Sequence, residues 1–378
     1  MHATSGHGRL VSPPSGEIRL ITLPDGVVLA TGNETDLVLT SSDAPDGAYF
    51  STYDADRDRW LSAGRPAMTG MQGSASVLVD GRVLLAGGLV EAHCPPSSDG
   101  LEPAHVERCF VGLARVEVWS PARRTFEPAA PLARPRFGHA GLRLDDGRVL
   151  VMGGKSFAGV PTVGGVPRGE PMASAVSLQA CEVYDSKTDR WAAAAPMHAP
   201  RGEVAAMKLD DGRVLVAGDG GAEIFAPREN TWASLPGTPA WQRPVLVVLS
   251  PGRVLGVGKL AGEGRVKAAI LDVGTPTWSD ASGLTTDKVP IAVVRLKAPD
   301  PRVAVFSASS VILWDPERGT SEEKPLTQVR DAGDAVLLPD GRVLVAGGAS
   351  YTRSCPDVNC SNFPSPSPPE FWAPPPRL

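Results

Sequence analysis

The sequence predicts an all-β fold, a β-propeller built from repeated four-stranded blades. A short motif recurs along the whole chain, in which an Asp-Gly or Pro-Gly turn precedes about four aliphatic residues and then glycine. A Tyr-Asp or Trp element and a further aromatic residue follow most copies. The copies are about 39 to 66 residues apart, which fits the roughly 40 to 50 residues of a four-stranded blade plus loops of variable length.

The second strand of each repeat is the motif itself, seen most clearly at residues 146–154. Its aliphatic run is too short for a helix and suits a buried strand that leaves a tight hairpin turn. An apolar run before each copy predicts the first strand. The copies of the motif begin at Asp25, Asp80, Asp146, Asp211, Pro251 and Asp340, with a degraded one near Arg302. The first strands are expected at 18–23, 76–79, 140–144, 204–209, 245–249, 291–296 and 335–338.

Aromatic residues mark the third and fourth strands. Tyr184-Asp185 is followed by Trp191, and Tyr53-Asp54 by Trp60, with a polar turn between them. The alternation of residues 116–119 has the period of two that is typical of a strand. Seven of the eight Trp residues fall at such repeat positions. These residues are expected to pack between neighbouring blades.

The end of the chain predicts how the repeats close. The last repeat reaches its third strand at residues 371–376 and has no fourth, so the segment 9–11 is expected to supply that strand and close a ring. We expect seven blades, with six or eight as alternatives, in a single domain spanning residues 1–378. Deleting residues 1–14 should then lower the unfolding midpoint and expose a sheet edge.

Composition excludes several classes of function. The chain has 41 Gly, 37 Pro and only 21% charged residues, which favours turns over solvated helices. With a net charge of −5 and no Lys/Arg-rich run, nucleic acid is not an expected partner. No apolar run is long enough to span a membrane, and residues 1–15 lack the features of a signal peptide. We expect a monomer, either cytoplasmic or processed after export.

The repeat pattern resembles that of the kelch-repeat β-propeller family. That family has a Gly pair after a hydrophobic strand, a Tyr-Asp strand, a downstream Trp and an Arg that opens the next repeat. Residues 136–191 contain all of these elements, whereas residues 256–259 and 306–309 lack the Gly pair. The resemblance covers nearly the whole chain. It implies a fold that hosts binding modules and enzymes alike.

Three connections that follow the Gly pairs are much longer than the rest, at 89–114, 155–180 and 349–369. Long connections of this kind are usually functional or disordered. In a propeller they lie on one face together with the links that enter each first strand. We therefore expect that face to bind the partner or ligand.

Four of the five cysteines lie in two of these connections, Cys94 with Cys109 and Cys355 with Cys360. Pairs within single loops indicate disulfides and so an extracellular or cell-envelope protein, although pairing between loops is also open. The fifth, Cys181, occupies an apolar strand position and is expected to be a buried free thiol. One alternative is a zinc site in the first loop, made by His93, Cys94, His105 and Cys109.

One position just before the first strand is cationic in four of seven repeats. Side chains converging there could hold an anionic group at the mouth of a central channel. The alternative is that each cationic side chain pairs with a nearby acidic residue and so holds its own loop in place. The nearby acidic residues are Glu203, Asp331 and Asp334. Along the chain, this position holds Ser15, Met71, Arg136, Arg201, Trp241, Lys288 and Arg330. The predicted ligand-binding residues are the last five of these together with two neighbours, namely Arg136, Arg201, Trp241, Lys288, Arg330, His139 and Glu203.

A second shared position lies on the third strand and holds Glu117, Glu182, Glu223 and Glu370. Its recurrence indicates a structural role, because blades spread these carboxylates too far apart for paired acid–base catalysis. The predicted function is an interaction platform for a protein, peptide or carbohydrate, without a metal or cofactor. Alternatives are a sugar mutarotase or lyase and a structural domain of a larger secreted protein.

A copper-radical oxidase is a further alternative, because proteins similar to galactose oxidase have a kelch propeller body. The resemblance implies that such a site needs two Tyr, two His and a Cys cross-linked to Tyr, and a further C-terminal domain. The chain has four Tyr, and Tyr53 and Tyr184 are repeat residues, which leaves Tyr49 and Tyr351. The sequence therefore does not favour copper.

Overall fold

The computed structural model consists of antiparallel β-sheets, in agreement with the all-β prediction. The described residues form two compact units. Unit 1 comprises Met1–Ala67, Ser120–Thr125 and Pro236–Leu378, and unit 2 comprises Met68–Trp119 and Phe126–Leu235. The structure describes residues 17–33, 50–64, 66, 72–92, 109–157, 162–163, 166–167, 170–330, 333–354, 361–366 and 369–376.

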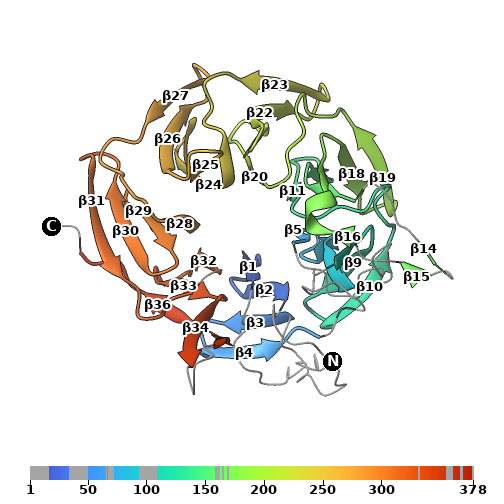
Figure 1. The fold of residues 1–378 in the computed structure, drawn as a ribbon, viewed down its shortest axis with the longest axis horizontal. Coiled ribbons are helices and arrows are strands. Elements are labelled where there is room, and N and C mark those ends of the chain that lie inside the picture. The colour runs from blue at the N-terminus through green and yellow to red at the C-terminus, as the bar shows by residue number, and fades with distance from the viewer. Residues whose placement is uncertain are drawn as a thin grey trace, which may run out of the picture. The chain divides into compact units, whose positions relative to one another are not determined.

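The described residues of unit 1 form three four-stranded sheets and one three-stranded sheet, each joined in sequence order (Figure 1). A separate hairpin is formed by β34 (Ala349–Ser354) and β35 (Ser361–Pro366). The sheets are β1 (Glu17–Thr22), β2 (Val28–Asn33), β3 (Phe50–Asp54), β4 (Arg59–Ser62); β24 (Trp241–Ser250), β25 (Arg253–Leu260), β26 (Val266–Asp272), β27 (Thr277–Asp280); β28 (Pro290–Arg295), β29 (Val303–Ser307), β30 (Ser310–Asp315), β31 (Thr320–Pro325); and β32 (Asp334–Leu337), β33 (Val343–Ala346), β36 (Glu370–Trp372).

In the described part of unit 2 there are three four-stranded sheets of the same kind, one of which reaches into the turn 120–125 that is counted with unit 1. Each pairs a first strand with the motif strand, and the motif strand with an aromatic third strand. The sheets are β5 (Ser74–Val77), β6 (Val83–Ala86), β9 (Val116–Ser120), β10 (Thr125–Ala129); β11 (Ala140–Arg143), β12 (Val149–Met152), β18 (Cys181–Asp185), β19 (Arg190–Ala194); and β20 (Val204–Lys208), β21 (Val214–Gly218), β22 (Gly221–Ala226), β23 (Thr231–Leu235).

The Asp-Gly-Arg sequence closes the hairpin between first and second strands. At Asp146, one carboxylate oxygen accepts the backbone N–H of Arg148 at 3.0 Å, and the other accepts its guanidinium Nε–H at 2.8 Å. Gly147 has φ of +89°, a conformation that only glycine adopts without strain. The same bonds recur at Asp80, Asp211 and Asp340. Hydrogen bonds within the turn therefore fix where the first and second strands of each of these hairpins pair.

The aromatic residues of the third and fourth strands form the predicted core. Tyr184 and Trp191 stack with ring centroids 5.0 Å apart. The indole N–H of Trp191 donates to the carbonyl of Ala130 at 2.7 Å. In the next sheet, the indole N–H of Trp232 donates to the carbonyl of Ala195, which lies in the link before β20. These two fourth strands are thereby tied to the chain segments that enter their own sheets. The expectation that these Trp residues are structural is confirmed for both.

All seven expected first strands are present, as β1, β5, β11, β20, β24, β28 and β32. Within the described residues, a 3-10 turn at Met172–Ser174 is the sole helical element, as the composition indicated. Over the same residues no helix is long and apolar enough to cross a membrane. The sheet β32–β33–β36 has three strands, and residues 9–11, expected to supply its fourth, lie outside the described residues. Ring closure and the blade count remain predictions.

Asp334 links two sheets of unit 1 and makes stability depend on pH. Its carboxylate accepts the backbone N–H of Leu20 on β1 at 2.9 Å and that of Ala335 at 2.8 Å. Burial raises the pKa of Asp334 to about 6, although these bonds and the charge of Arg19 oppose the shift. Because the folded state holds this proton more tightly than the unfolded chain, stability is lost as pH rises from about 4 to about 6.

We therefore expect Asp334→Asn to raise the free energy of unfolding at pH 8 by about 1 to 2 kcal/mol, because an amide oxygen still accepts from Leu20 without a charge to bury. At pH 4 the two proteins should differ little. Urea unfolding at both pH values provides the measurement. An equal change in the free energy of unfolding at pH 4 and pH 8 would contradict the raised pKa of Asp334.

Candidate functional site

Arg136, which was predicted to bind a ligand, is instead enclosed within its own sheet. Its side chain is 1% exposed, and Nη2 lies 2.6 Å from Oε1 of Glu182 on β18. Nη1 donates to the carbonyls of Gly153 and Ala180. Burial lowers the pKa of Arg136, and the neighbouring Glu182 carboxylate partly offsets that shift. The guanidinium thus joins the motif strand to the third strand.

The same arrangement recurs in two further repeats. Arg201 lies 2.6 Å from Glu223, with both side chains 1% exposed, and Arg330 lies 3.8 Å from Glu370. In each repeat the glutamate also accepts the backbone N–H of the residue three positions before the arginine. Those donors are Ala133, His198 and Thr327, at 2.8, 3.0 and 3.0 Å. Each glutamate therefore fixes the loop that delivers its arginine.

The Gly pair completes this brace. The N–H of Gly154 donates to the carbonyl of Arg201 at 2.9 Å, and the N–H of Gly88 donates to that of Arg136 at 2.8 Å. A Cβ on Gly154 would lie 2.5 Å from the carbonyl oxygen of Phe137, so no larger residue fits there. Consecutive repeats of unit 2 are thereby joined through the same Arg segment.

The expectation of an open cationic site is therefore corrected. Arg136, Arg201 and Arg330 are in contact with glutamates and carbonyls and are buried, because the shared position places the guanidinium inside the sheet. Lys288 is more exposed, yet its Nζ lies 2.6 Å from Glu323 and 3.1 Å from the Ser310 hydroxyl. Ser15, Met71 and Asp331 lie outside the described residues.

Two other predicted ligand-binding residues belong to the core. Trp241 is fully buried, donates its indole N–H to the carbonyl of Lys267 at 2.9 Å, and stacks edge-on against Trp278. His139 is fully buried, and its Nε2 lies 2.9 Å from the hydroxyl of Ser74. Neither side chain reaches a surface from which it could touch a ligand.

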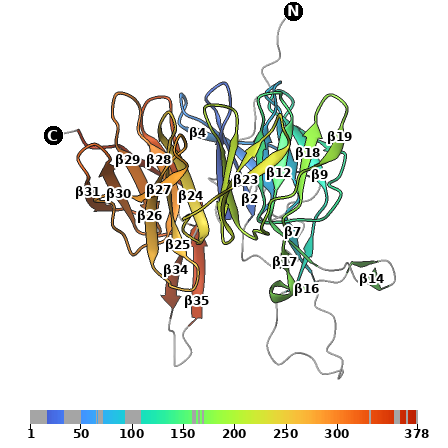
Figure 2. The same cartoon turned by 90° about the horizontal axis from the view of Figure 1, so that it is seen from above.

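The long connections of unit 2 fold into accessory strands. In the first and second connections, β7 (Leu89–Ala92), β8 (Cys109–Gly112) and β16 (Glu170–Pro171) form a three-stranded sheet. The second also contains the pairs β13 (Lys155–Ser156) with β17 (Val176–Ser177), and β14 (Thr162–Val163) with β15 (Val166–Pro167). Figure 2 shows β14, β16 and β17 beyond the ends of the four-stranded sheets of their unit. We call this end of unit 2 its loop side.

The bases of these accessory strands are built around a small apolar cluster. Leu89, Phe110 and Phe137 are buried against one another, with Phe157 and Ala175 packed on them. Phe137 and Phe157 stack with centroids 5.3 Å apart. The first two connections are therefore held to unit 2 by their own core.

Five polar side chains meet at this loop side and form what we call the polar site. They lie around Gly138 and around Gly202, whose N–H donates to Asp219 at 3.2 Å. Next to it, Nζ of Lys155 lies 3.6 Å from Oε1 of Glu203. The members are Gln72, Lys155, Ser177, Glu203 and Asp219.

The contacts of two glycines locate the remaining members of the polar site. A Cβ on Gly202 would lie 2.4 Å from Cε of Lys155 and 2.7 Å from Oγ of Ser177. A Cβ on Gly138 would lie 3.7 Å from the amide oxygen of Gln72 and 3.9 Å from Cγ of Glu203. Lys155 and Ser177 are also cross-strand partners and so share one face of their ladder. Glycine at 202 is what allows the charged groups to approach.

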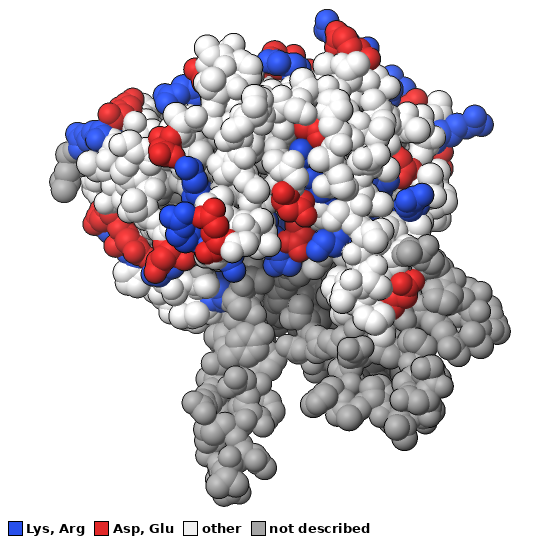
Figure 3. All heavy atoms as spheres, turned by 45° about the horizontal axis from the view of Figure 1, so that its top comes forward, with Lys and Arg blue, Asp and Glu red and all other residues white. Residues whose placement is uncertain are grey.

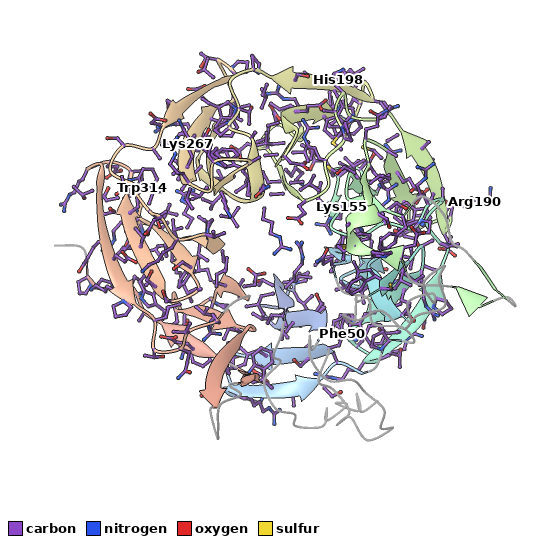
Figure 4. All side chains as sticks on the ribbon, viewed as in Figure 1. Phe50, Lys155, Arg190, His198, Lys267 and Trp314 are labelled. Carbon is purple, nitrogen blue, oxygen red and sulfur yellow. The ribbon has the colours of Figure 1, made fainter. Side chains whose placement is uncertain are left out.

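The polar site is open, unlike the buried Arg–Glu braces. The side chains of Lys155 and Glu203 are 30% and 31% exposed, whereas those of Arg136, Arg201 and Arg330 are at most 1% exposed. Figure 4 shows Lys155 on the inner side of its unit, whereas Arg190, which begins β19, and His198, in the link that follows β19, lie on the outer side. Of the predicted ligand-binding residues, Glu203 and Lys288 are the ones that lie in solvent-facing clusters, Glu203 with Lys155 and Lys288 with Glu323. Lys155, Ser177, Gln72 and Asp219 were missed because they come from different repeats.

The cysteines divide between confirmed and untested predictions. Cys181 is the free, buried thiol that its strand position predicted. Cys94, Cys355 and Cys360 lie outside the described residues, as do His93 and His105, so the disulfide pairs and the zinc alternative stay predictions.

Burial raises the pKa of the Cys181 thiol to about 11, so the reactive thiolate is scarce at neutral pH. We expect iodoacetamide at pH 8 to leave Cys181 unlabelled in the native protein and to label it in concentrated guanidinium chloride. Peptide mapping by mass spectrometry provides the measurement. Rapid labelling of native Cys181 would show that its strand opens.

Comparison with known proteins supports the fold. No family model and no curated protein matches the chain. Among solved structures, it is similar to a fungal alcohol oxidase of the AA5 family, solved in complex with copper, with a TM-score of 0.64. The match covers 97% of this chain and 76% of the oxidase at 17% sequence identity. The two chains share a fold. This likeness supports a propeller-like arrangement of sheets and does not extend to activity.

The described residues do not fit a copper-radical site. Tyr53 and Tyr184 are buried, and their hydroxyls donate to Asp58 and Asp189 at 2.6 and 2.8 Å. Burial and these carboxylates raise both tyrosine pKa values well above the ordinary range. Over the described part of the chain, no group of three or more His, Cys, Asp or Glu residues could hold a metal ion. Tyr49 lies outside that part, and Tyr351 belongs to β34.

Proposed function

We propose that this protein is an interaction platform that binds a partner protein, a peptide or a carbohydrate through the loop side of unit 2. The observation that carries the proposal is the polar site at the base of the accessory strands. Lys155 and Ser177 lie on paired strands β13 and β17, and Glu203 and Asp219 flank them from the neighbouring sheet. A few convergent polar groups on a preformed frame are typical of binding sites.

The distribution of charge supports the same proposal. The arginines and glutamates that repeat along the chain brace the sheets, which makes the frame rigid and leaves recognition to the connections. On the face drawn in Figure 3, Lys and Arg are interspersed with Asp and Glu. A surface of mixed sign favours recognition by a local cluster over long-range attraction by one charge.

Replacing residues 158–174 by a short Gly-Ser linker tests the platform. This change removes the accessory strands β14, β15 and β16 but keeps Phe157 and Ala175 of the apolar cluster. Wild-type protein on peptide and glycan arrays should bind a restricted set of ligands, and the variant should lose most of that binding while its melting temperature changes little. Binding that survives the replacement, or arrays without any bound ligand, would refute the proposal.

A sugar mutarotase or lyase is the alternative function. That class would need a compact cluster of Arg, Glu and His open to substrate. The described Arg136, Arg201 and Arg330, together with His139, are buried and bonded inside the sheets. Binding without chemistry is therefore the function we propose. The extracellular or cell-envelope location rests on the predicted cysteine pairs and stays a prediction.

A further inference from the structure

We infer that the outer edge of β19 pairs with the same edge of a second copy of this chain, so that the protein forms a weak symmetric dimer. β19 (Arg190–Ala194) is the fourth strand of its sheet, and among the described strands it pairs with β18 alone (Figure 1). The other edge of such a strand carries main-chain N–H and C=O groups that a further extended chain can bond. This edge is separate from the polar site, so the inference goes beyond the proposed function.

The hydrogen bonds inside the sheet show that Ala193 faces outward. The N–H of Gly153 donates to the carbonyl of Ala180, and bonded pairs alternate with non-bonded pairs along an antiparallel ladder. Glu182, two residues after Ala180, therefore turns its N–H and C=O toward β12. Its partner on β19 is Ala193, whose N–H and C=O consequently point away from β18.

A residue beyond the end of β19 gives the same direction independently. The N–H of Ala195 donates to the side chain of Asn230, and its carbonyl accepts from the indole of Trp232, so both groups point away from β18. Main-chain groups two residues apart in a strand point the same way. Trp191 and Ala193 therefore present two N–H and two C=O groups at the outer edge, and no described residue bonds them there.

Most of the other fourth strands are protected against the addition of a strand. At the place that Ala193 has in β19, the protection is a charged side chain, a proline without an N–H, or a carbonyl that an arginine already bonds. The residues are Asp280 on β27, Glu323 on β31, Pro128 on β10 and Ser62 on β4, the last bonded by Arg124.

β19 lacks each of these forms of protection. It has neither a charged residue nor a proline after Arg190, and its exposed Ala192 and Ala193 let another backbone approach on either face. On β23 the same place holds Ser234, and the imidazole of His198 lies 3.2 Å from its hydroxyl, so a side chain already stands beside that edge. Of the six described fourth strands, β19 is therefore the most open.

A second copy fits this edge under a twofold axis. In an antiparallel pair centred on Ala192, Trp191 of each copy lies opposite Ala193 of the other, which gives four main-chain hydrogen bonds. Ala192 then faces Ala192 of the other copy, and Arg190 faces Ala194. The two Arg190 residues are about 14 Å apart along the strands, so like charges do not meet.

The number and the length of open edges limit the assembly. Because the pairing uses the same edge of both copies, association stops at two. The strand has only 5 residues, which is short for a protein interface, so we expect a Kd on the order of 0.1 mM. The sequence alone suggests a monomer, and the open edge of β19 is the observation that favours a dimer instead.

Sedimentation velocity of the full chain from about 5 µM to about 1 mM tests the dimer. Wild type should pass from monomer to dimer over this range. Ala193→Pro should weaken dimerisation about tenfold or more, because each copy loses one of the bonded N–H groups. The sheet should accept this change, since Pro128 has the same place in β10. Ser234→Pro, at the same place in β23, is the matched control and should dimerise like wild type.

A charge on the twofold axis tests the register. Ala192→Lys sets two lysines opposite each other and should weaken dimerisation about fivefold, whereas an equimolar mixture of Ala192→Lys and Ala192→Glu should recover the wild-type dimer. Because Ala192 is exposed, both variants should melt like wild type. This pair of variants decides between the outcomes without Ala193→Pro, should that variant fail to fold.

A chain that stays monomeric at about 1 mM would overturn the inference. A dimer that neither Ala193→Pro nor Ala192→Lys weakens would do the same, as would a dimer that Ser234→Pro weakens instead, or assembly beyond two copies. Replacing residues 158–174 should leave the dimer intact, so the loop side and the edge of β19 are tested separately.

Discussion

Replacing Glu223 by alanine is expected to lower the free energy of unfolding by about 3 to 5 kcal/mol. The substitution leaves the guanidinium of Arg201 without its partner at 2.6 Å, in a place where its side chain is 1% exposed. It also removes the acceptor for the backbone N–H groups of His198 and Ala199. The buried guanidinium would keep its carbonyl acceptors but lose its counter-charge, and two partly buried backbone donors would lose their acceptor at the same time. Urea unfolding followed by tryptophan fluorescence gives the value.

Asp145→Ala is the matched control for this prediction. It also breaks an ion pair of 2.6 Å in unit 2, but Lys208 and Asp145 are 40% and 64% exposed, so a cost within about 1 kcal/mol is expected. The double variant Arg201→Met/Glu223→Leu should recover much of the loss, because no buried charge remains. If Glu223→Ala costs no more than Asp145→Ala, the Arg–Glu pair is not the brace that its geometry indicates.

The pH dependence of the same pair has a definite sign. Burial raises the pKa of Glu223, but hydrogen bonds from the His198 backbone and the Arg201 side chain outweigh it and hold the pKa below the ordinary value. The stability that this group contributes is therefore present at neutral pH and is lost as pH falls through the lowered pKa. Glu223→Ala should accordingly cost less in acid than at pH 7.

The sheets could be predicted from the sequence because their signals are local. A turn such as Asp146-Gly147-Arg148 closes through bonds within three residues, so each copy of the motif specifies its own hairpin. The function of the cationic position could not be predicted in this way. Alignment of the repeats gives a position along the strand order, but it does not tell whether a side chain turns into the sheet or toward solvent.

A signal for the Arg–Glu brace was nevertheless present in the repeats. The glutamate always pairs with the third residue of the motif strand, as Glu182 does with Val151 and Glu370 with Val345. Where the arginine is replaced by Trp241, the corresponding third-strand residue is Ala269. In three repeats the arginine and the glutamate occur together, which indicates a contact, whereas the repeat that has Met71 keeps Glu117 without the arginine. The polar site has no such signal, because its members come from four separate segments that only the folded chain brings together.

Replacing Trp241 by alanine is expected to lower the free energy of unfolding by about 3 to 5 kcal/mol. The indole is fully buried and occupies the space left by two glycines of β25. A Cβ on Gly256 would lie 2.7 Å from the Trp241 ring, and a Cβ on Gly258 would lie 2.9 Å from it. In the repeat of Trp241, one large side chain therefore occupies the place that the Arg136–Glu182 ion pair occupies in its own repeat. Val289→Ala, at a 44% exposed apolar residue of the same unit, is the control and should cost within about 0.5 kcal/mol.

A double-mutant cycle separates this packing role from contact with a ligand. Gly256→Ala alone should destabilise the protein by about 1 to 3 kcal/mol, because the added methyl group overlaps the indole. In the Trp241→Ala background the same methyl group enters the vacated space, so it should cost little or even stabilise. Thermal and urea unfolding of the four proteins measure the coupling. Independent effects of the two substitutions, or a Trp241→Ala protein with wild-type stability and weakened ligand binding, would show instead that the indole serves recognition.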